Sequence, residues 1–412
     1  MNGRRRILVV APWVPAPTSG FGTRVFQLCR GLARAHEVHV LCHAEPGDED
    51  AVAQLSERVE AVHTVPAAGR ARWRKRVVQA TSLVSPVPFE TRRLASASLQ
   101  AAFDALVRHS SFDLVQVEST HLGRLDTRGL PVLLDEHNIE YELLARVAAA
   151  SDSPIRKAYY RWDSVRTRRQ ERRMWRRVAA CAVTSAREQD VVVRHAGATP
   201  TGVVPNGVDT EYFCPGDDAD VDSASVVFVG TMHYQPNVDA AIHFIRNVLP
   251  LLWRDRPDVV FTAVGHSAPR ELTRLAGPRV VVTGTVPDVR PFLRRAAAVV
   301  VPLRSGSGTR LKILEAMAVG RPVVSTRLGA EGLDATDGEH LVVAEEPGEF
   351  AGAVRRLLED ASSGAHLGTR ARLFVEDRYS WHSAVRALDT LQCRVDRARC
   401  ATAGLAAAAE GL

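Results

Sequence analysis

The segment GSGTRLKILEAMAVGRPVVST covers residues 306–326 and predicts a helix followed by a strand. We expect the helix to begin near Thr309, with Ser307 or Thr309 as its cap. It should end at Gly320, because glycine favours a helix end and Pro322 follows it. The next residues, RPVVST, have the β-branched composition of a short buried strand. A helix that leads into such a strand is the repeating unit of an α/β fold.

Short apolar runs recur along the whole chain, and segments with helical periodicity separate them. They are four to six residues long and rich in β-branched residues, which is typical of buried parallel strands. The first series includes RILVVA (6–11), EVHVLC (37–42), FDLVQV (112–117) and PVLLD (131–135). A second series includes VVFVG (226–230) and AVVVP (298–302). The sequence therefore predicts an α/β protein with two doubly wound, Rossmann-like domains.

A turn-rich segment separates the two series. It contains Pro205, the pair Asn206-Gly207, Pro215-Gly216 and a run of aspartates, all of which interrupt regular periodicity. We expect an N-terminal domain at 1–200, an interdomain linker at 201–222 and a second domain at 223–377. In doubly wound sheets ligands bind at the carboxyl ends of the strands, so a central cleft between two facing domains is the expected site.

Composition limits the classes of partner. The chain has 412 residues, of which 46% are hydrophobic, and a net charge of only +6. This charge favours small anions over nucleic acid. The six cysteines are scattered, which predicts neither a zinc site nor a disulfide framework. No apolar run reaches membrane-spanning length, so we expect a cytoplasmic protein.

Two segments are densely basic, at 71–78 and from Arg156 to Arg177. In the second, Tyr159, Trp162, Val165 and Trp175 are candidates for the buried side of a solvated helix. Contact of these segments with an anionic polymer, or peripheral contact with the inner face of a membrane, is the alternative interpretation.

The helix start at 306–312 has an unusual charge. Helix N-termini carry partial positive charge and favour acidic residues, but here Arg310 and Lys312 occupy that end. A bound diphosphate would explain the pattern, because the dipole, the backbone N–H groups and both cations would then attract the same anion. Glu315, one turn further, would accept hydrogen bonds from vicinal sugar hydroxyls. In the alternative interpretation both cations are solvated and Lys312 pairs with Glu315.

A second glycine-containing turn follows the first predicted strand. Gly20, Phe21 and Gly22 stand at a helix start, where two glycines let the backbone approach a ligand. The third glycine of a dinucleotide fingerprint is missing, so no Rossmann cofactor site is predicted.

Five motifs, taken in order, resemble those of glycosyltransferase family 4: SGFG, LDEHNIE, VPNGVD, VVFVGTM and LKILEAMAVGRPVVST. Members of that family are retaining enzymes of the GT-B fold that use nucleotide sugars. The resemblance runs from about residue 6 to Trp381. It implies that a C-terminal helix, at 378–396, returns to the N-terminal domain, and that an Ala/Gly-rich tail, 397–412, follows.

The resemblance implies roles for residues of the predicted second domain. The second glutamate of the family signature falls on Glu315, which would bind the ribose, and the first falls on Ser307, so sugar recognition must differ here. The family's two phosphate-binding cations are replaced by Thr231 and by Pro236 or Asn237; Arg310 and Lys312 would compensate. The expected donor-binding residues are Gly230, Thr231, Gly306, Ser307, Gly308, Thr309, Leu311 and Glu315.

In the N-terminal half, His137 matches the family's histidine after a strand, where an imidazole would position the sugar or the acceptor, or move the acceptor's proton. A histidine that merely caps the strand end is the alternative. Asp135 and Glu136 should point to opposite sides of their strand. The expected acceptor-side residues are Gly20, Phe21, Gly22, Glu118 and Asn206.

The resemblance implies transfer of a sugar, with retention, from a nucleotide-diphosphate sugar to a glycan, lipid-linked or small-molecule hydroxyl. Arg310 and Lys312 would stabilise the departing phosphate, with His137 as the third catalytic residue. We expect no metal site and no cofactor. An epimerase or phosphorylase of the same fold, and a non-catalytic nucleotide-sugar-binding protein, are the alternatives.

Overall fold

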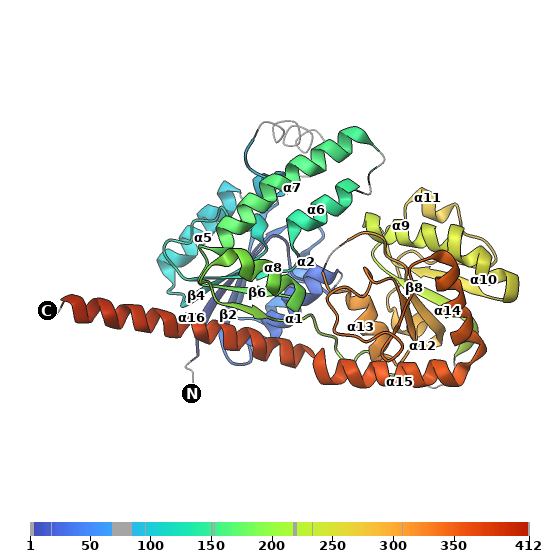
Figure 1. Ribbon diagram of the computed structural model, residues 1–412. Helices are drawn as coiled ribbons and strands as arrows, with labels where there is room; N and C mark the ends of the chain where they lie inside the picture. The colour runs from blue at the N-terminus through green and yellow to red at the C-terminus, as the bar shows by residue number, and fades with distance from the viewer. Residues whose placement is uncertain are drawn as a thin grey trace. The chain divides into compact units, whose positions relative to one another are not determined.

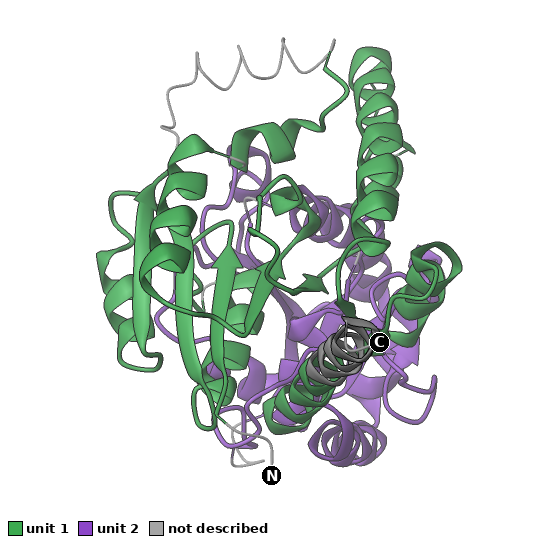
Figure 2. Cartoon of the chain, turned by 90° about the vertical axis from the view of Figure 1, so that its left-hand side faces the viewer, with its two compact units in different colours: residues 1–205, 381–412 green, residues 206–380 purple. Residues whose placement is uncertain are grey.

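The computed structural model describes residues 4–17, 19–67, 85–94, 96–149, 151, 153–216, 221–232, 234–306 and 308–410, and side chains up to residue 395. Ser307, the basic segment 71–78 and the aspartates at 217, 218 and 220 lie outside these residues. The chain forms two compact units, residues Met1–Pro205 with Trp381–Leu412 and residues Asn206–Ser380 (Figures 1 and 2).

Within the described residues, the first unit holds a parallel sheet of seven strands in the order β3-β2-β1-β4-β5-β6-β7. The strands are β1 (Arg6–Ala11), β2 (Glu37–Ala44), β3 (Ala61–Pro66), β4 (Leu114–Glu118), β5 (Val132–Glu136), β6 (Ala180–Val183) and β7 (Thr201–Val203). The helices are α1 (Gly20–Leu32), α2 (Glu49–Ser56), α4 (Phe89–Leu94), α5 (Ala97–His109), η1 (Thr120–Leu122), α6 (Glu140–Ala149), α7 (Pro154–Trp175), α8 (Ala186–Ala196) and α16 (Trp381–Glu410).

The second unit holds a parallel sheet of six strands, again counted over the described residues, in the order β10-β9-β8-β11-β12-β13. The strands are β8 (Asp222–Val229), β9 (Val260–Val264), β10 (Val280–Val282), β11 (Ala296–Val301), β12 (Val323–Ser325) and β13 (Val342–Val343). The helices are α9 (Gln235–His243), the π-helical turn η3 (Phe244–Val248), α10 (Leu249–Asp255), α11 (Arg270–Thr273), α12 (Arg290–Arg295), α13 (Leu311–Ala318), α14 (Pro347–Glu359) and α15 (Ala361–Arg378).

Both sheets have the doubly wound topology that the alternating strand and helix patterns predict. The strand order reverses between β1 and β4 and between β8 and β11, and ligands bind in such folds at the carboxyl edge of this switch point. The predicted linker is shorter than expected, since residues 201–203 form β7 and residue 222 opens β8.

Helix α16 belongs to the first unit, although it follows the second unit in sequence (Figure 1). Glycines make room for it, because a Cβ at Gly31 would lie 2.3 Å from Val385 and one at Gly202 would lie 3.4 Å from Leu391. The helix continues through most of the Ala/Gly-rich segment, to Glu410.

Helix α7 covers the basic segment, but its predicted buried side is wrong. Trp175 is buried, whereas Trp162 and Val165 are each 44% exposed. The buried side is polar instead, and hydrogen bonds satisfy several of its groups. Arg166 pairs with Asp163 at 2.5 Å. Ser164 donates to the carbonyl oxygen of Tyr141, and Glu171 accepts from two backbone N–H groups at the start of α6.

Candidate active site

Helix α13 begins at Leu311, with Arg310 in the cap position, so the predicted start near Thr309 is wrong by about two residues. The loop before it explains the delay. Gly306 and Gly308 have φ angles of 115° and 77°, which are left-handed conformations that other residues rarely adopt, and the chain becomes helical only beyond them. No side chain in the described residues caps this helix start.

The ammonium group of Lys312 is fixed beside the end of β8. It donates a 2.7 Å hydrogen bond to Oδ1 of Asn237 and lies 4.4 Å from the ring centroid of Phe228. Asn237 is oriented in turn by its Nδ2, which donates to the carbonyl oxygen of Thr231 at 3.0 Å. The expected alternative pairing of Lys312 with Glu315 is therefore replaced by a neutral partner from α9.

Glycine at position 230 makes this arrangement possible. A Cβ at Gly230 would lie 2.8 Å from both Nζ of Lys312 and Nδ2 of Asn237. The family's expected cations near Thr231 and Asn237 are missing from the sequence, but the structure brings Lys312 to Asn237 from another helix.

Arg310 is only 9% exposed, and its guanidinium group lies against the glycine loop. A Cβ at Gly306 would come within 3.0 Å of its Nη2 and 3.6 Å of the Tyr234 hydroxyl. The backbone carbonyl of Thr309 accepts a hydrogen bond from Asn206 at 3.3 Å. Asn206, which we expected on the acceptor side, thus belongs to the second unit and supports the loop before α13.

The pKa values of two titratable groups near the start of α13 are shifted. Burial, and then the nearby charge of Arg310, lowers the pKa of Lys312 to about 7. Burial raises the pKa of Glu315 to about 7, although the charge of Lys312 opposes this. Leu311 packs on the core at the same helix end. We call Gly230, Asn237, Arg310, Lys312 and Glu315 the α13 cluster. It lies at the carboxyl edge of the second sheet and concentrates positive charge for an anion.

A second cluster occupies the carboxyl edge of the first sheet. Nε2 of His137 lies 2.8 Å from Oε2 of Glu118 and 3.6 Å from Oδ2 of Asp135. The imidazole stacks on Phe21 with ring centroids 4.7 Å apart. We call Glu118, Asp135 and His137 the β4–β5 cluster. His137 thus has a carboxylate partner and an aromatic support, which is more than a strand cap requires.

Helix α1 reaches this cluster through Phe21 and Arg24. Ser19 caps the helix by accepting from the N–H of Gly22. Position 22 must be glycine, because a Cβ there would lie 2.1 Å from the carbonyl oxygen of Ala16. The Ser19 cap and the close packing of Gly22 on Ala16 thereby fix the backbone on both sides of Phe21.

Arg24 and a buried amide chain hold the carboxylates. Arg24 donates to both oxygens of Asp135, at 2.7 and 2.9 Å. Gln116 donates to Oε1 of Glu118 at 2.6 Å, and Gln392 of α16 donates to Gln116 at 2.8 Å. No local motif relates Arg24, Gln116 and Gln392, which come from α1, β4 and α16, so the sequence does not predict them as site residues.

The pKa values of Glu118 and Asp135 shift in opposite directions, although both carboxylates are buried. Burial and the charge of Asp135 raise the pKa of Glu118. Burial also works against ionisation of Asp135, but Arg24 and His137 hold its pKa below the usual value. The cluster therefore combines a carboxylate that stays ionised with one that protonates more readily.

Asp135 and Glu136 point to opposite sides of β5, as expected. Glu136 accepts from Nε1 of Trp175 at 2.9 Å and lies near Glu171. Burial raises the pKa of Glu136, and burial together with the charge of Glu136 raises that of Glu171. Glu171 of this pair binds the N-terminal end of α6, and neither carboxylate belongs to the β4–β5 cluster.

The β4–β5 cluster has three ligand atoms within 4.8 Å of one another, a spacing that a metal ion could use. Arg24, however, already binds both oxygens of Asp135, so a cation there would meet the guanidinium charge.

In the part of the chain that the structure describes, no helix is both long and apolar enough to cross a membrane.

Comparisons with known proteins cover both units. The model of "Glycosyltransferase Family 4" matches residues 18–212, and that of "Glycosyl transferases group 1" matches residues 223–360. D-inositol 3-phosphate glycosyltransferase from Acidothermus cellulolyticus is 31% identical over 45% of this chain and 46% of its own length. The enzyme of the same name from Paenarthrobacter aurescens is 25% identical over 88% of this chain and 90% of its own length. An uncharacterised protein from the cps region of Klebsiella pneumoniae is 24% identical, and the chain spans 44% of its length.

Solved structures share the fold. Sucrose-phosphate synthase from Thermosynechococcus elongatus superposes with a TM-score of 0.72 at 19% identity and covers 96% of this chain and 100% of its own. HepE from Anabaena, solved with UDP and glucose, has a TM-score of 0.68 at 15% identity over 94% of this chain and 99% of its own. The expected pair of parallel-sheet α/β domains of the GT-B type is confirmed.

Proposed function

Because the chain belongs to glycosyltransferase family 4 and has the GT-B fold, we propose that it transfers a hexosyl group, with retention, from a nucleotide-diphosphate sugar to a hydroxyl acceptor. The observation that carries the proposal is the position of Lys312. Its ammonium group lies beside Asn237 and Gly230, the region in which the family's phosphate-binding cations were expected.

In the proposed reaction the bond between the sugar's anomeric carbon and the diphosphate oxygen breaks, and the acceptor oxygen bonds to the same face of that carbon. The diphosphate takes the acceptor's proton as it leaves. Lys312, Arg310 and the backbone N–H groups at the start of α13 stabilise its negative charge. Glu315 accepts hydrogen bonds from the ribose hydroxyls, and Gly306 and Gly308 let the loop approach the sugar.

His137 has a positioning role in this proposal. Glu118 orients the imidazole, and Phe21 supports its face, so the ring is held ready to bind a hydroxyl of the donor sugar or of the acceptor. The reaction needs no metal ion, because the cations of the α13 cluster supply the charge. Solved HepE with UDP-glucose supports a nucleotide sugar as the donor.

The decisive experiment screens nucleotide sugars for binding and transfer with the wild type, Arg310→Ala and Lys312→Ala. Each substitution should weaken donor affinity or turnover by at least tenfold, about 1.4 kcal/mol. Arg246→Ala, at an exposed position of the same unit, is the control. Unchanged kinetics in both variants would remove the phosphate assignment.

Further measurements address the remaining alternatives. Activity that persists in EDTA would support metal independence, and an NMR assignment of the product's anomeric configuration tests retention. Interconversion of donor sugars without an acceptor would instead indicate an epimerase, and tight binding without turnover would indicate a binding protein.

A further inference from the structure

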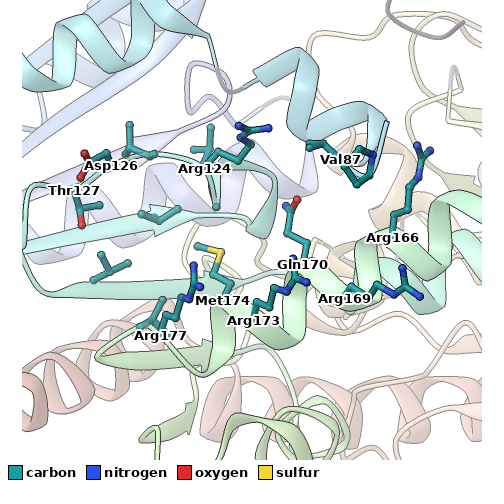
Figure 3. A pocket seen from close by; sticks show the side chains of 17 residues that line it. Val87, Arg124, Asp126, Thr127, Arg166, Arg169, Gln170, Arg173, Met174 and Arg177 are labelled. Atoms are coloured by element: carbon teal, nitrogen blue, oxygen red, sulfur yellow. The ribbon is translucent and has the colours of Figure 1, made fainter. Parts of the chain in front are cut away.

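A cavity of about 530 Å³ lies in the first unit, between α7, η1 and the segment before α4 (Figure 3). This volume is typical of a site for a small molecule. Its charged lining residues are Arg124, Arg166, Arg169, Arg173, Arg177 and Asp126. The proposed transfer reaction uses none of these side chains.

The positive charge in this cavity is not balanced by the residues that the structure describes. Arg124, Arg169, Arg173 and Arg177 are exposed, and none of them forms an ion pair with a residue that the structure describes. The acidic lining residue, Asp126, already pairs with Arg128 at 2.8 Å.

The carboxylates of α7 are also occupied. Asp163 pairs with Arg166, and Glu171 accepts hydrogen bonds from the backbone of α6. Neither therefore neutralises the exposed arginines of the cavity.

The arginines form a row that continues beyond the end of α7. Arg169 and Arg173 are four residues apart, which places them on the same side of the helix about 6 Å apart, and Arg177 follows in the turn after the helix end at Trp175. Like charges at this spacing destabilise a helix, and an anion that lies along the row would remove the repulsion. Guanidinium groups bind phosphate through paired N–H donors, so closely spaced phosphates match this row.

The floor of the cavity is apolar and its walls are fixed. Val117, Val132, Met174 and Val178 line the floor. Gln170 ties α7 to α4 and η1, because its Nε2 donates to Oγ1 of Thr91 at 2.7 Å and to the carbonyl oxygen of Thr120 at 2.8 Å. The cavity is thus preorganised, with a charged rim around a base that suits an apolar or sugar-like group.

The Arg177 end of the cavity lies away from the β4–β5 cluster. Val132 begins β5, and Arg177 and Val178 precede β6, so this end is at the amino edge of the parallel strands. Glu118 and His137 lie at the carboxyl edge of the same sheet. The other end reaches Val117, next to Glu118 in β4, but no residue of the α13 cluster or of the β4–β5 cluster lines the cavity.

We propose that this arginine-lined cavity binds a ligand with two or more closely spaced phosphate groups next to an apolar or sugar moiety. A soluble organic diphosphate and the headgroup of a phosphate-bearing lipid share this chemistry. The proposal does not depend on the proposed transferase function.

The methionines provide a local readout. The chain has four, and Met174 lies on the cavity floor, whereas Met232 and Met317 lie in the second unit. With methyl-¹³C methionine, NMR titration with inorganic pyrophosphate should shift the Met174 signal. Shifts at Met232 or Met317 would report binding at the α13 cluster, so the two sites are followed separately.

The variants are Arg169→Gln with Arg173→Gln, and Arg161→Gln as a control at an exposed position of the same helix outside the cavity. The double variant should weaken the Met174 titration at least tenfold, and the control should leave it within twofold. A second arm replaces pyrophosphate by phosphatidylcholine vesicles with and without phosphatidic acid. A Met174 response in either arm that needs the two arginines supports the proposal and identifies the source. No response in both arms, or one that the double variant retains, overturns it.

Discussion

The ammonium group of Lys312 donates a 2.7 Å hydrogen bond to Oδ1 of Asn237. The partner is a neutral amide, and burial together with the charge of Arg310 lowers the pKa of Lys312 to about 7. A large part of the lysine population is therefore neutral near pH 8 until an anion arrives. Ligand binding at the proposed phosphate site can therefore be followed as proton uptake by Lys312.

Binding of UDP should be accompanied by proton uptake at pH 8, because a bound diphosphate raises the pKa of Lys312 above its value in the free protein. Affinity should then increase as the pH falls from about 9 towards 7, by up to about tenfold per pH unit. Calorimetry in buffers of different ionisation enthalpy measures the uptake. Lys312→Met should bind UDP weakly and take up no proton, and uptake that persists in this variant would assign the proton to another group.

Gly230→Ala should impair donor binding. The added Cβ would lie 2.8 Å from Nζ of Lys312 and from Nδ2 of the buried Asn237, so both partners of the 2.7 Å hydrogen bond must shift. We expect the KM for the donor to rise at least tenfold. Gly277→Ala is the matched control, because a Cβ there meets nothing within 4 Å. Equal kinetics in the two variants would contradict the assigned position of Lys312.

Glu118→Gln should lower kcat about tenfold and leave the affinity for UDP unchanged. The carboxylate accepts from Nε2 of His137 at 2.8 Å and orients the ring, which an amide does less well because its NH₂ group can only donate. A ¹⁵N spectrum of His137 should show a changed tautomer in the variant. Glu90→Gln, on the surface pair with Arg93, serves as the control. An unaltered His137 spectrum would refute the positioning role of Glu118.

Glu171→Gln should flatten the pH dependence of stability. Burial and the charge of Glu136 raise the pKa of Glu171 well above the ordinary value of 4.5 in the folded state. Its stabilising contribution is complete below pH 4.5 and is lost as the pH rises through the folded pKa. One such proton changes the free energy of unfolding by at most about 1.4 kcal/mol per pH unit.

Urea unfolding of wild type and Glu171→Gln between pH 4.5 and 8 measures this slope. The slopes matter more than the absolute values, because glutamine offers fewer acceptors to the backbone N–H groups of Glu140 and Tyr141. The exposed Glu211→Gln should retain the wild-type slope. Identical slopes in all three proteins would contradict the raised pKa.

The sequence by itself determined the α/β class and the central strands of both sheets, because a buried parallel strand must be a short apolar run whatever surrounds it. It did not predict β3, β7 or β13, which lie at the sheet edges. It also indicated the charged start of α13, because Arg310, Lys312 and Glu315 are neighbours along one helix and local spacing places them together. His137 was found through the resemblance to the family, in which a histidine follows the corresponding strand.

Only the tertiary structure decided the partners of these groups. Asn237 comes from α9, Arg24 from α1 and Gln392 from α16, and no local pattern relates them to Lys312, Asp135 or Gln116. The buried side of α7 was mispredicted for the same reason: its polar groups are buried because residues distant in sequence satisfy their hydrogen bonds. Local periodicity records which side chains are apolar, but the free energy of burying a polar group depends on partners that only the folded chain brings near.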